Sequence, residues 1–312
     1  MNNIKVTIAC ITFNHSQYII EAIESFLMQK ANFTYEILIH DDASTDGTTE
    51  ILKKYEEKFK EKIRVIYQTE NQYMKGKRIL PILYKESRGE YIALCEGDDF
   101  WLDPLKLQKQ VDILEKNPKY GGCFHAGIIL DAKTNKRLRL VKPFKISREV
   151  GAKETILGGG EFVLTNSIVF RSRLLEEFPE KFKYFPVGDY PLQILISLKE
   201  KAYYMKDIMS AYRYRTPGSW SVQQDNIDKN IKTKLKIIEM LEELNIFTRY
   251  EYREFFEYKK LYYEFLILKL KKNYLKMQDK KFEKIYHNLK LRSKLKLTIL
   301  CLYDKVKRKK YE

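Results

Sequence analysis

The chain has 312 residues, of which 44% are hydrophobic and 13% aromatic, so it can bury a substantial core and lacks the composition of a disordered protein. Its formal net charge of +16 favours anionic ligands or surfaces, such as phosphorylated compounds, phospholipids or nucleic acids. Residues 221–312 hold 24 lysines and arginines against 13 acidic residues, and therefore 11 of the 16 excess charges.

Cysteine usage and the N-terminal sequence indicate the compartment. The cysteines lie far apart, mostly in apolar runs, and form no Cys-x-x-Cys pair: Cys10, Cys95, Cys123 and Cys301. This is the pattern of buried thiols in a reducing compartment. The sequence shows no signal-peptide pattern and no 18-residue apolar span, so we expect a cytoplasmic protein.

Strand and helix patterns alternate through the first hundred residues. Apolar, β-rich runs suit buried strands, and between them apolar residues recur at helical spacing. The predicted strands lie at residues 5–12, 35–40, 63–67 and 91–95, and the predicted helices at about 16–28, 48–59 and 79–86. This alternation predicts an α/β fold with a Rossmann-like, mostly parallel central sheet wrapped by helices.

Polar residues collect where three of these strands end. They are Thr12 and Asn14, Asp41 and Asp42, and Asp98 and Asp99. Right-handed crossovers bring these ends to one edge of the sheet, where open α/β sheets bind ligands. Paired aspartates there suit a divalent cation or an acid/base pair; the alternative is an acidic turn before a helix that opens at Asp103-Pro104.

Two common phosphate-binding loops are absent from the sequence. The loop after the first strand, residues 13–16, has no glycine, and no Gly-x-x-x-x-Gly-Lys-Ser/Thr occurs anywhere. A bound phosphate would therefore be neutralised in another way, and a metal ion on Asp98 and Asp99 would do so. A sugar nucleotidyltransferase would also need a glycine-rich N-terminal loop.

Four motifs resemble, in order and spacing, those of family 2 glycosyltransferases. They are Thr12-Phe13-Asn14, Asp41-Asp42-Ala43-Ser44-Thr45-Asp46-Gly47-Thr48, Glu96-Gly97-Asp98-Asp99-Phe100-Trp101 and Gly188-Asp189-Tyr190. The resemblance covers about residues 4–220. It implies the GT-A fold and a nucleotide-sugar-binding, catalytic domain at residues 1–220, followed by a basic helical extension at 221–312.

The resemblance also implies a nucleotide site. It places Thr12, Phe13 and Asn14 around the base, and Asp42 as the acceptor of a hydrogen bond from the imide N–H of uracil or thymine, which favours a UDP-sugar donor. The alternative is that the aspartates and Ser44 of this motif only cap the following helix.

For the diphosphate, the resemblance makes Asp99 the main ligand of Mn²⁺ or Mg²⁺, with Asp98 beside it. Lys75 and Arg78 lie in a loop that reaches pyrophosphate in the family, although such charges are also common on solvated surfaces. Arg215 stands where many members have a histidine. Arginine stays protonated and is no ordinary metal ligand, yet it can clamp a diphosphate, so the third protein ligand stays open.

Asp189 precedes an apolar helix that runs to about residue 198. The resemblance makes it the general base of an inverting transfer to a hydroxyl of a glycan or lipid-linked acceptor, in bacterial surface polysaccharide or capsule synthesis. The alternative is an ordinary helix N-cap. For the whole chain, a sugar-nucleotide-binding protein without transferase activity is the alternative function. A nucleic-acid-binding or membrane-binding module would explain the charge alone, and we expect no nucleic-acid partner.

The C-terminal part has only helical patterns, at residues 231–244 and 250–270. Residues 289–310 combine apolar residues at helical spacing with a polybasic end. This segment suits an interfacial helix on the anionic inner face of the cell membrane, or a helix packed on the protein with a solvated lysine tail. Both interpretations stay open at this point.

Overall fold

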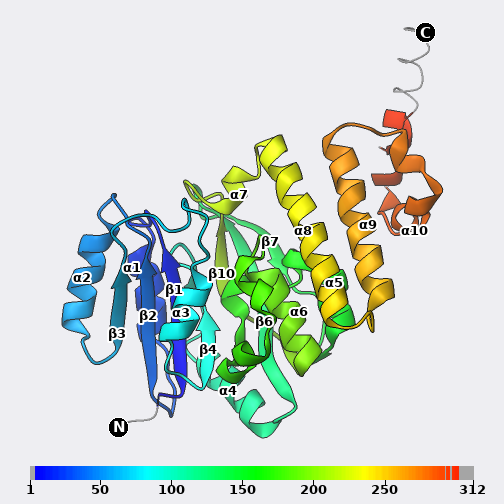
Figure 1. The fold of residues 1–312 in the computed structure, drawn as a ribbon. Coiled ribbons are helices and arrows are strands. Elements are labelled where there is room, and N and C mark those ends of the chain that lie inside the picture. The colour runs from blue at the N-terminus through cyan, green and yellow to red at the C-terminus, as the bar shows by residue number, and fades with distance from the viewer. Residues whose placement is uncertain (1–3, 292, 296, 302–312) are drawn as a thin grey trace. The chain divides into compact units, whose positions relative to one another are not determined.

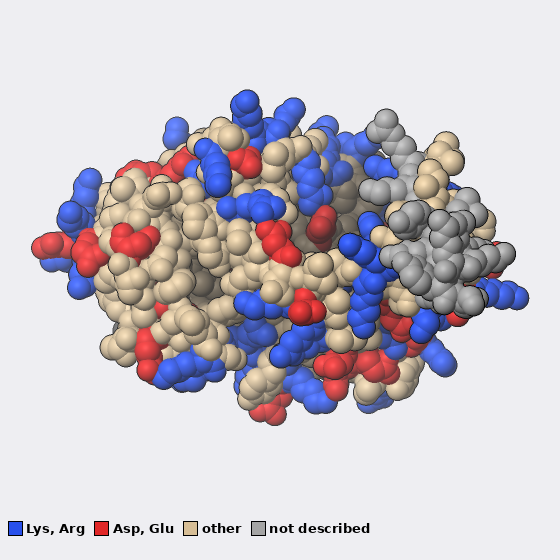
Figure 2. Space-filling view, turned by 90° about the horizontal axis from the view of Figure 1, so that it is seen from above, with Lys and Arg blue, Asp and Glu red and all other residues tan. Residues whose placement is uncertain are grey.

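The computed structural model describes residues 4–291, 293–295 and 297–301. The chain divides into two compact units, Met1–Val222 and Gln223–Glu312 (Figure 1). Over the view in Figure 2, acidic side chains lie between the lysines and arginines, so the positive charge does not form one continuous stripe there. The two units are described separately below.

The first unit begins with the predicted strand–helix alternation. The parallel strands are β1 (Val6–Thr12), β2 (Tyr35–Asp41), β3 (Ile63–Tyr67) and β4 (Tyr91–Leu94). The helices between them are α1 (Ile19–Leu27), α2 (Thr48–Lys58) and α3 (Leu80–Glu86). The sheet runs in the order β3-β2-β1-β4-β9-β6-β10-β5. The predicted α/β class and the first four strands are therefore confirmed.

Further strands, in both antiparallel and parallel pairs, complete the sheet. These strands are β5 (Phe100–Trp101), β6 (Tyr120–Asp131), β7 (Arg137–Val141), β8 (Arg148–Val150), β9 (Val169–Arg171) and β10 (Lys201–Tyr214). Strand β9 is antiparallel to both β4 and β6, and β6 and β10 are parallel. The helices of this half are α4 (Lys106–Lys116), α5 (Ala152–Gly158) and α6 (Asp189–Lys199).

Helices cover both faces of the sheet because its strands are apolar on both sides. In β1, Ile8 and Cys10 belong to the cluster that includes α1, whereas Ala9 belongs to the cluster that includes Leu83 of α3 and Leu192 of α6. This follows from the alternation of side chains along a strand. All four cysteines are buried thiols, as predicted.

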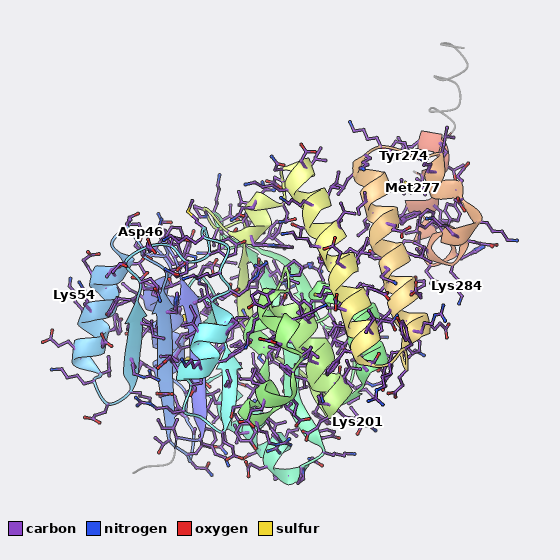
Figure 3. The ribbon with its side chains drawn as sticks, viewed as in Figure 1. Asp46, Lys54, Lys201, Tyr274, Met277 and Lys284 are labelled. Carbon is purple, nitrogen blue, oxygen red and sulfur yellow. The ribbon has the colours of Figure 1, made fainter. Side chains whose placement is uncertain are left out.

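The strand ends meet as predicted. Thr12 pairs with Asp41 at the ends of β1 and β2, and the Asp42 N–H donates to the Thr12 carbonyl at 3.0 Å. The Gly97 N–H after β4 donates to the Ile11 carbonyl at 2.8 Å. Figure 3 shows Asp46 at this end of the sheet and Lys201, the first residue of β10, at the opposite end.

The second unit contains α8 (Ile227–Phe247), α9 (Arg253–Leu270) and α10 (Glu283–His287). A core of its own gathers Phe265, Met277, Phe282, Ile285, Leu297 and Cys301. In the last described helical stretch, Leu291, Leu295 and Ile299 are 74%, 56% and 64% exposed. Residues 302–310 of the predicted amphipathic segment lie outside the described residues. No helix in the described ranges is both long and apolar enough to traverse a lipid bilayer.

A buried lysine lies in the core of the first unit. Lys106, the first residue of α4, is 0% exposed, and its Nζ lies 3.9 Å from the centre of the Trp101 ring with no hydrogen-bond partner among the described residues. Burial lowers the pKa of Lys106 from 10.5 to about 7. The folded protein therefore holds this proton less tightly than the unfolded chain does.

We expect Lys106→Met to raise the free energy of unfolding at pH 7 by about 2–4 kcal/mol, because a pKa unit corresponds to about 1.4 kcal/mol. The wild-type free energy of unfolding should rise with pH above about 7, where the unfolded chain binds more protons, and the variant should lack this rise. Urea unfolding across that pH range measures both. Lys116→Met on the exposed face of α4 is the control. A Lys106 variant that is less stable at every pH would contradict this interpretation.

Candidate active site

The loop after β1 is shaped by side chains of the acidic motif after β2. Three successive backbone N–H groups donate to that motif at 2.9 Å each: Asn14 to Ser44 Oγ, His15 to Thr48 Oγ1 and Ser16 to Asp46 Oδ2. Asn14 adopts a left-handed conformation with φ of 55°. Burial alone would raise the pKa of Asp46, but hydrogen bonds from Thr48 and Ser16 lower it to about 2. This anchor of the loop is therefore ionised near neutral pH.

Asp41 and Asp42 hold different segments. Asp41 accepts hydrogen bonds from the Ser44 N–H and the Thr49 hydroxyl, within the turn that leads into α2. Asp42 accepts the N–H groups of Gln72 at 2.8 Å and Tyr73 at 3.0 Å, one at each carboxylate oxygen. Asp42 therefore fixes the loop after β3, and each of its oxygens keeps a lone pair for a further donor.

Thr12 and Phe13, also predicted in the nucleotide site, lie at the same edge. Thr12 is buried, and its Oγ1 has no hydrogen-bond partner among the described residues. A Cβ at position 97 would lie 2.7 Å from this oxygen, so only glycine fits in the acidic loop there. Phe13 is 36% exposed and presents ring surface to solvent.

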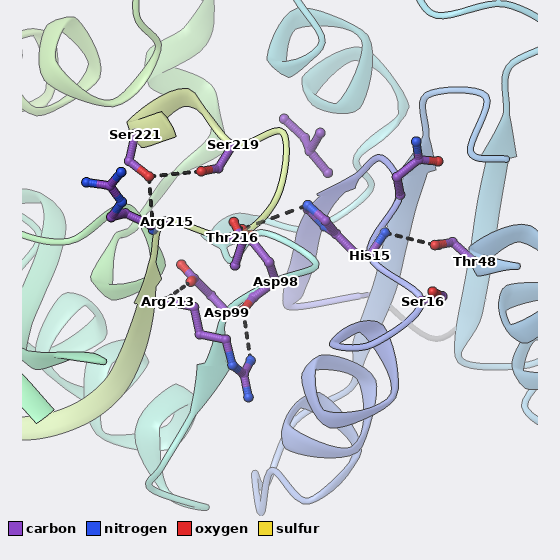
Figure 4. A network of polar contacts seen from close by, with 12 residues as sticks. His15, Ser16, Thr48, Asp98, Asp99, Arg213, Arg215, Thr216, Ser219 and Ser221 are labelled. Atoms are coloured by element: carbon purple, nitrogen blue, oxygen red, sulfur yellow. Dashed lines mark hydrogen bonds and ion pairs between the residues drawn. The ribbon is translucent and has the colours of Figure 1, made fainter. Parts of the chain in front are cut away.

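The two adjacent aspartates have different surroundings (Figure 4). Asp99 is 0% exposed; its Oδ1 accepts the Arg213 N–H and its Oδ2 accepts Asn166 Nδ2, both at 2.9 Å. Asp98 Oδ2 accepts the Thr216 hydroxyl at 2.6 Å, whereas Asp98 Oδ1 accepts no hydrogen bond from the described residues. Burial, with repulsion from Asp98, raises the pKa of Asp99 well above its ordinary value. The carboxylate with an available oxygen is Asp98.

Arg213 of β10 ties the acidic loop to α1. Its buried guanidinium donates to the Asp98 carbonyl at 2.8 Å and pairs with Glu21. It lies over the rings of Phe100, at 4.5 Å, and Tyr18, at 5.1 Å. The charge is thereby satisfied in a buried setting, and the loop is held on two sides.

Asp189 belongs to the same acidic cluster. Burial first, and then the charges of Asp98 and Asp189, raise the pKa of Glu96 to about 8. Burial also raises the pKa of Asp189, and hydrogen bonds, including one from Thr165 Oγ1 at 3.4 Å, oppose this. Glu96 thus lies within electrostatic range of both aspartates.

The N-cap alternative for Asp189 does not describe the helix. Gly188 occupies the N-cap position of α6, and no side chain caps this end. Asp189 is the first helical residue, and its Oδ1 accepts the N–H of the next residue, Tyr190, at 2.8 Å. The Tyr190 hydroxyl donates to the Ile156 carbonyl at 2.7 Å, which fixes this end of α6.

The three basic residues predicted to contact the diphosphate differ in their surroundings. Lys75 is half exposed and pairs with Glu70. Arg78 is partly buried, which lowers the pKa of its guanidinium. The backbone N–H of Arg215 donates to Ser221 Oγ at 3.1 Å, and its guanidinium extends away from Asp98 in Figure 4. The structure therefore does not bring Arg215 to the acidic loop.

Sequence reasoning missed several residues of the site: His15, Glu21, Asn166, Arg213 and Thr216. They come from five segments, and their meeting depends on tertiary structure. The one signal for Asn166 was its place in a polar triplet, Thr165-Asn166-Ser167, inside an apolar stretch.

A metal ion at this site would need ligands from outside the protein as well. In the described part of the chain, no group of three or more His, Cys, Asp or Glu residues is arranged to hold an ion. Asp98 Oδ1 is available, and His15 Nε2 lies 3.8 Å from Asp98 Oδ2. These residues fit a cation held by one or two protein ligands and completed by phosphate oxygens and water, as is common for Mg²⁺ with phosphate ligands.

The model of the family named glycosyl transferase family 2 matches residues 7–174. The chain belongs to this family. An uncharacterized protein of Mycobacterium tuberculosis is 32% identical over 218 residues, which are 69% of this chain and 60% of that protein. The chain thus spans less than two thirds of that relative's own length.

Staphylococcus aureus TarS, a poly(ribitol-phosphate) β-N-acetylglucosaminyltransferase, is 25% identical over 212 residues, which are 64% of this chain and 35% of TarS. Its residues 1–349 in complex with UDP-GlcNAc match with a TM-score of 0.56 and 14% identity, over 95% of this chain and 79% of that one. The mannosyltransferase PcManGT of Pyrobaculum calidifontis, in complex with GDP-Man and Mn²⁺, matches with a TM-score of 0.55 and 14% identity. The match covers 97% of this chain and 87% of that one. The fold is the predicted GT-A fold.

Proposed function

We propose that the protein is a metal-dependent, inverting glycosyltransferase that moves a sugar from a nucleoside-diphosphate sugar, most readily a UDP-sugar, to a hydroxyl acceptor. One observation carries the proposal. Asp98, a carboxylate with an available oxygen, lies in the loop after β4, and Asp189, a carboxylate with a raised pKa, accepts the hydroxyl of Thr165, the neighbour of the Asn166 that donates to Asp99. The first suits a cation and the second suits a base. In this proposal the unit Met1–Val222 holds the catalytic domain that the sequence predicted at residues 1–220, and the unit Gln223–Glu312 is its basic extension.

The nucleotide base lies against the loop after β1 in this proposal. Phe13 offers an exposed ring for stacking, and Thr12 and Asn14 flank it. The Asp42 carboxylate already accepts two N–H groups, and its remaining lone pairs can accept the imide N–H of a pyrimidine. The complex of TarS with UDP-GlcNAc supports a uridine donor. Lys75 and Arg78 are then candidates for outer contacts with the diphosphate.

The order of the two aspartates is the reverse of our prediction from the sequence. Asp99 is fully buried and both of its oxygens accept hydrogen bonds, so we assign it to positioning the loop. Asp98 becomes the main cation ligand. A bound Mn²⁺ or Mg²⁺ would offset the negative charge that develops on the departing nucleoside diphosphate. The complex of PcManGT with Mn²⁺ supports such an ion.

Asp189 acts on the acceptor. As the acceptor oxygen forms a bond to the anomeric carbon of the donor, its proton passes to the Asp189 carboxylate and the nucleoside diphosphate leaves from the opposite face. The raised pKa of Asp189 makes it a stronger base than an ordinary aspartate. The N-terminus of α6 counteracts the burial and favours the ionised form that this step requires.

The acceptor is a glycan or a lipid-linked glycan of the bacterial surface in this proposal, which the name of TarS supports. The proposal includes peripheral attachment to the membrane, which is supported by the exposed stripe Leu291, Leu295 and Ile299, spaced four residues apart, with exposed Lys290 beside it. An apolar stripe flanked by lysines suits an anionic lipid surface.

Asp98→Asn should abolish the enhancement of UDP binding by Mn²⁺, because it removes the negative charge that attracts the cation, while Asp99→Asn should retain that enhancement. Isothermal titration of UDP with and without Mn²⁺ measures both. Loss of metal dependence in the Asp99 variant alone, with the fold intact, would restore the order that the sequence suggested.

Asp189→Asn should lower turnover by roughly 10²–10⁴-fold, the usual size of a general-base contribution, with UDP affinity unchanged. Because the pKa of Asp189 is raised, the wild-type activity should fall with decreasing pH above the range of an ordinary aspartate, and the variant should lack this limb. The variant should also be more stable than the wild type above that pKa, since it has no buried charge. Wild-type turnover in the variant, on the true acceptor, would exclude the catalytic role.

Replacing Leu291, Leu295 and Ile299 by serine should release the protein from vesicles that contain anionic lipid. Wild-type binding, measured by cosedimentation, should weaken as salt screens the exposed charges. Vesicles of neutral lipid are the control. Vesicle binding that does not change with salt concentration, or no binding to anionic vesicles, would indicate that this segment only packs against the rest of the protein.

A further inference from the structure

We propose that His15 is a protein ligand of the divalent cation, beside Asp98. The inference rests on the cation of the proposed function and adds the nitrogen ligand that the sequence left open. It assigns this ligand to the loop after β1.

The spacing of the two side chains fits one shared ion. His15 Nε2 lies 3.8 Å from Asp98 Oδ2, and the two side chains are only 13% and 9% exposed. Two ligand atoms that are each about 2.1 Å from an ion lie up to about 4.2 Å apart, so one cation can contact both. Oδ2 keeps a lone pair for the ion besides the one that accepts the Thr216 hydroxyl. Figure 4 shows the imidazole of His15 directed toward Asp98.

The ring of His15 lacks the hydrogen bonds that a structural histidine makes. Its Nδ1 is buried with no hydrogen-bond partner among the described residues, and 3.8 Å is too long for a hydrogen bond from Nε2. His40 and His125 each have one ring nitrogen without a partner among the described residues, but their other nitrogen is engaged: His40 Nε2 contacts Gln68 at 3.2 Å, and His125 Nδ1 contacts the Ala126 carbonyl at 2.8 Å. Among the described residues His15 therefore has no hydrogen bond at either ring nitrogen, and Nε2, the nitrogen nearest Asp98, is available to an ion.

The local backbone is built to hold this ring in place. The His15 N–H donates to Thr48 Oγ1, and the N–H groups on either side of it are held by Ser44 and Asp46. Asn14 keeps a left-handed conformation, which is costly unless the surroundings enforce it. Three side chains of one motif thus fix the loop at the residue that faces Asp98.

The segment after β10 offers no comparable ligand. Thr216 uses its hydroxyl to donate to Asp98 Oδ2, and the guanidinium of Arg215 is directed away from the acidic loop.

A nitrogen ligand from His15 would change which metal the site prefers. Mg²⁺ strongly prefers oxygen ligands, so an imidazole shifts the preference of the site toward Mn²⁺.

Electron spin echo spectroscopy of Mn²⁺ bound to the full chain with UDP tests the inference, because the ¹⁴N of a directly bound imidazole modulates the echo. We expect this modulation in the wild type and its loss in His15→Ala. The variant should also bind Mn²⁺ in the presence of UDP roughly 10–100-fold more weakly, at least the loss found for residues that merely orient a ligand. Mg²⁺ binding should weaken less. His287→Ala, on an exposed histidine, is the control.

Other results would overturn the inference. If UDP binding depends on Mn²⁺ but the wild type shows no nitrogen modulation, His15 is not a ligand and the proposed function stands. If His15→Ala weakens UDP binding equally with and without metal, His15 contacts the diphosphate directly. If UDP binding in the wild type does not depend on Mn²⁺ at all, both the inference and the metal-dependent function fail.

Discussion

The buried carboxylate of Asp99 is the constraint on which the rest of the site depends. It accepts hydrogen bonds from the Arg213 N–H of β10 and from Asn166, and so fixes the loop after β4 to β10 and to the segment that precedes β9. The guanidinium of Arg213 holds the Asp98 carbonyl from the other side. Glu96, Asp98 and Asp99 repel one another, and these donors keep the loop in place against that repulsion.

Buried carboxylates that lie close together lower the stability of the folded protein, and they also have altered acid/base properties. Burial raises the pKa of Glu96, Asp99 and Asp189. These groups therefore ionise less readily in the folded protein than they would in water. A cation would relieve part of the repulsion, and in the proposed function the raised pKa makes Asp189 a stronger base than an ordinary aspartate. Sites of this kind commonly sacrifice stability for function.

The sequence predicted the parts of the fold that depend on local pattern. The alternation of strands and helices indicated the parallel half of the sheet, and the polar strand ends Thr12, Asp41 and Asp98 meet at one edge as expected. The different surroundings of Asp98 and Asp99 could not be inferred, because two adjacent residues of one type differ only in burial and partners. Those partners, such as Asn166, lie far away in the chain.

The motif after β2 illustrates the same limit. Its sequence suggested base recognition or helix capping, and the structure adds a third role, since Ser44, Asp46 and Thr48 hold the backbone of the loop after β1. This role requires knowing that β1 and β2 are neighbours in register. The importance of His15 follows from it, and a lone histidine in a loop gives no such indication by itself.

The central claim is that this edge of the sheet transfers a sugar with inversion, and proton NMR of the reaction tests it most directly. A panel of nucleotide sugars would be incubated with the full chain and Mn²⁺, and the anomeric configuration of the first transferred or hydrolysed sugar would be observed as it forms. We expect release of the nucleoside diphosphate from a UDP-sugar, with a product of opposite anomeric configuration to the donor. A product that retains the configuration of the donor would contradict the claim.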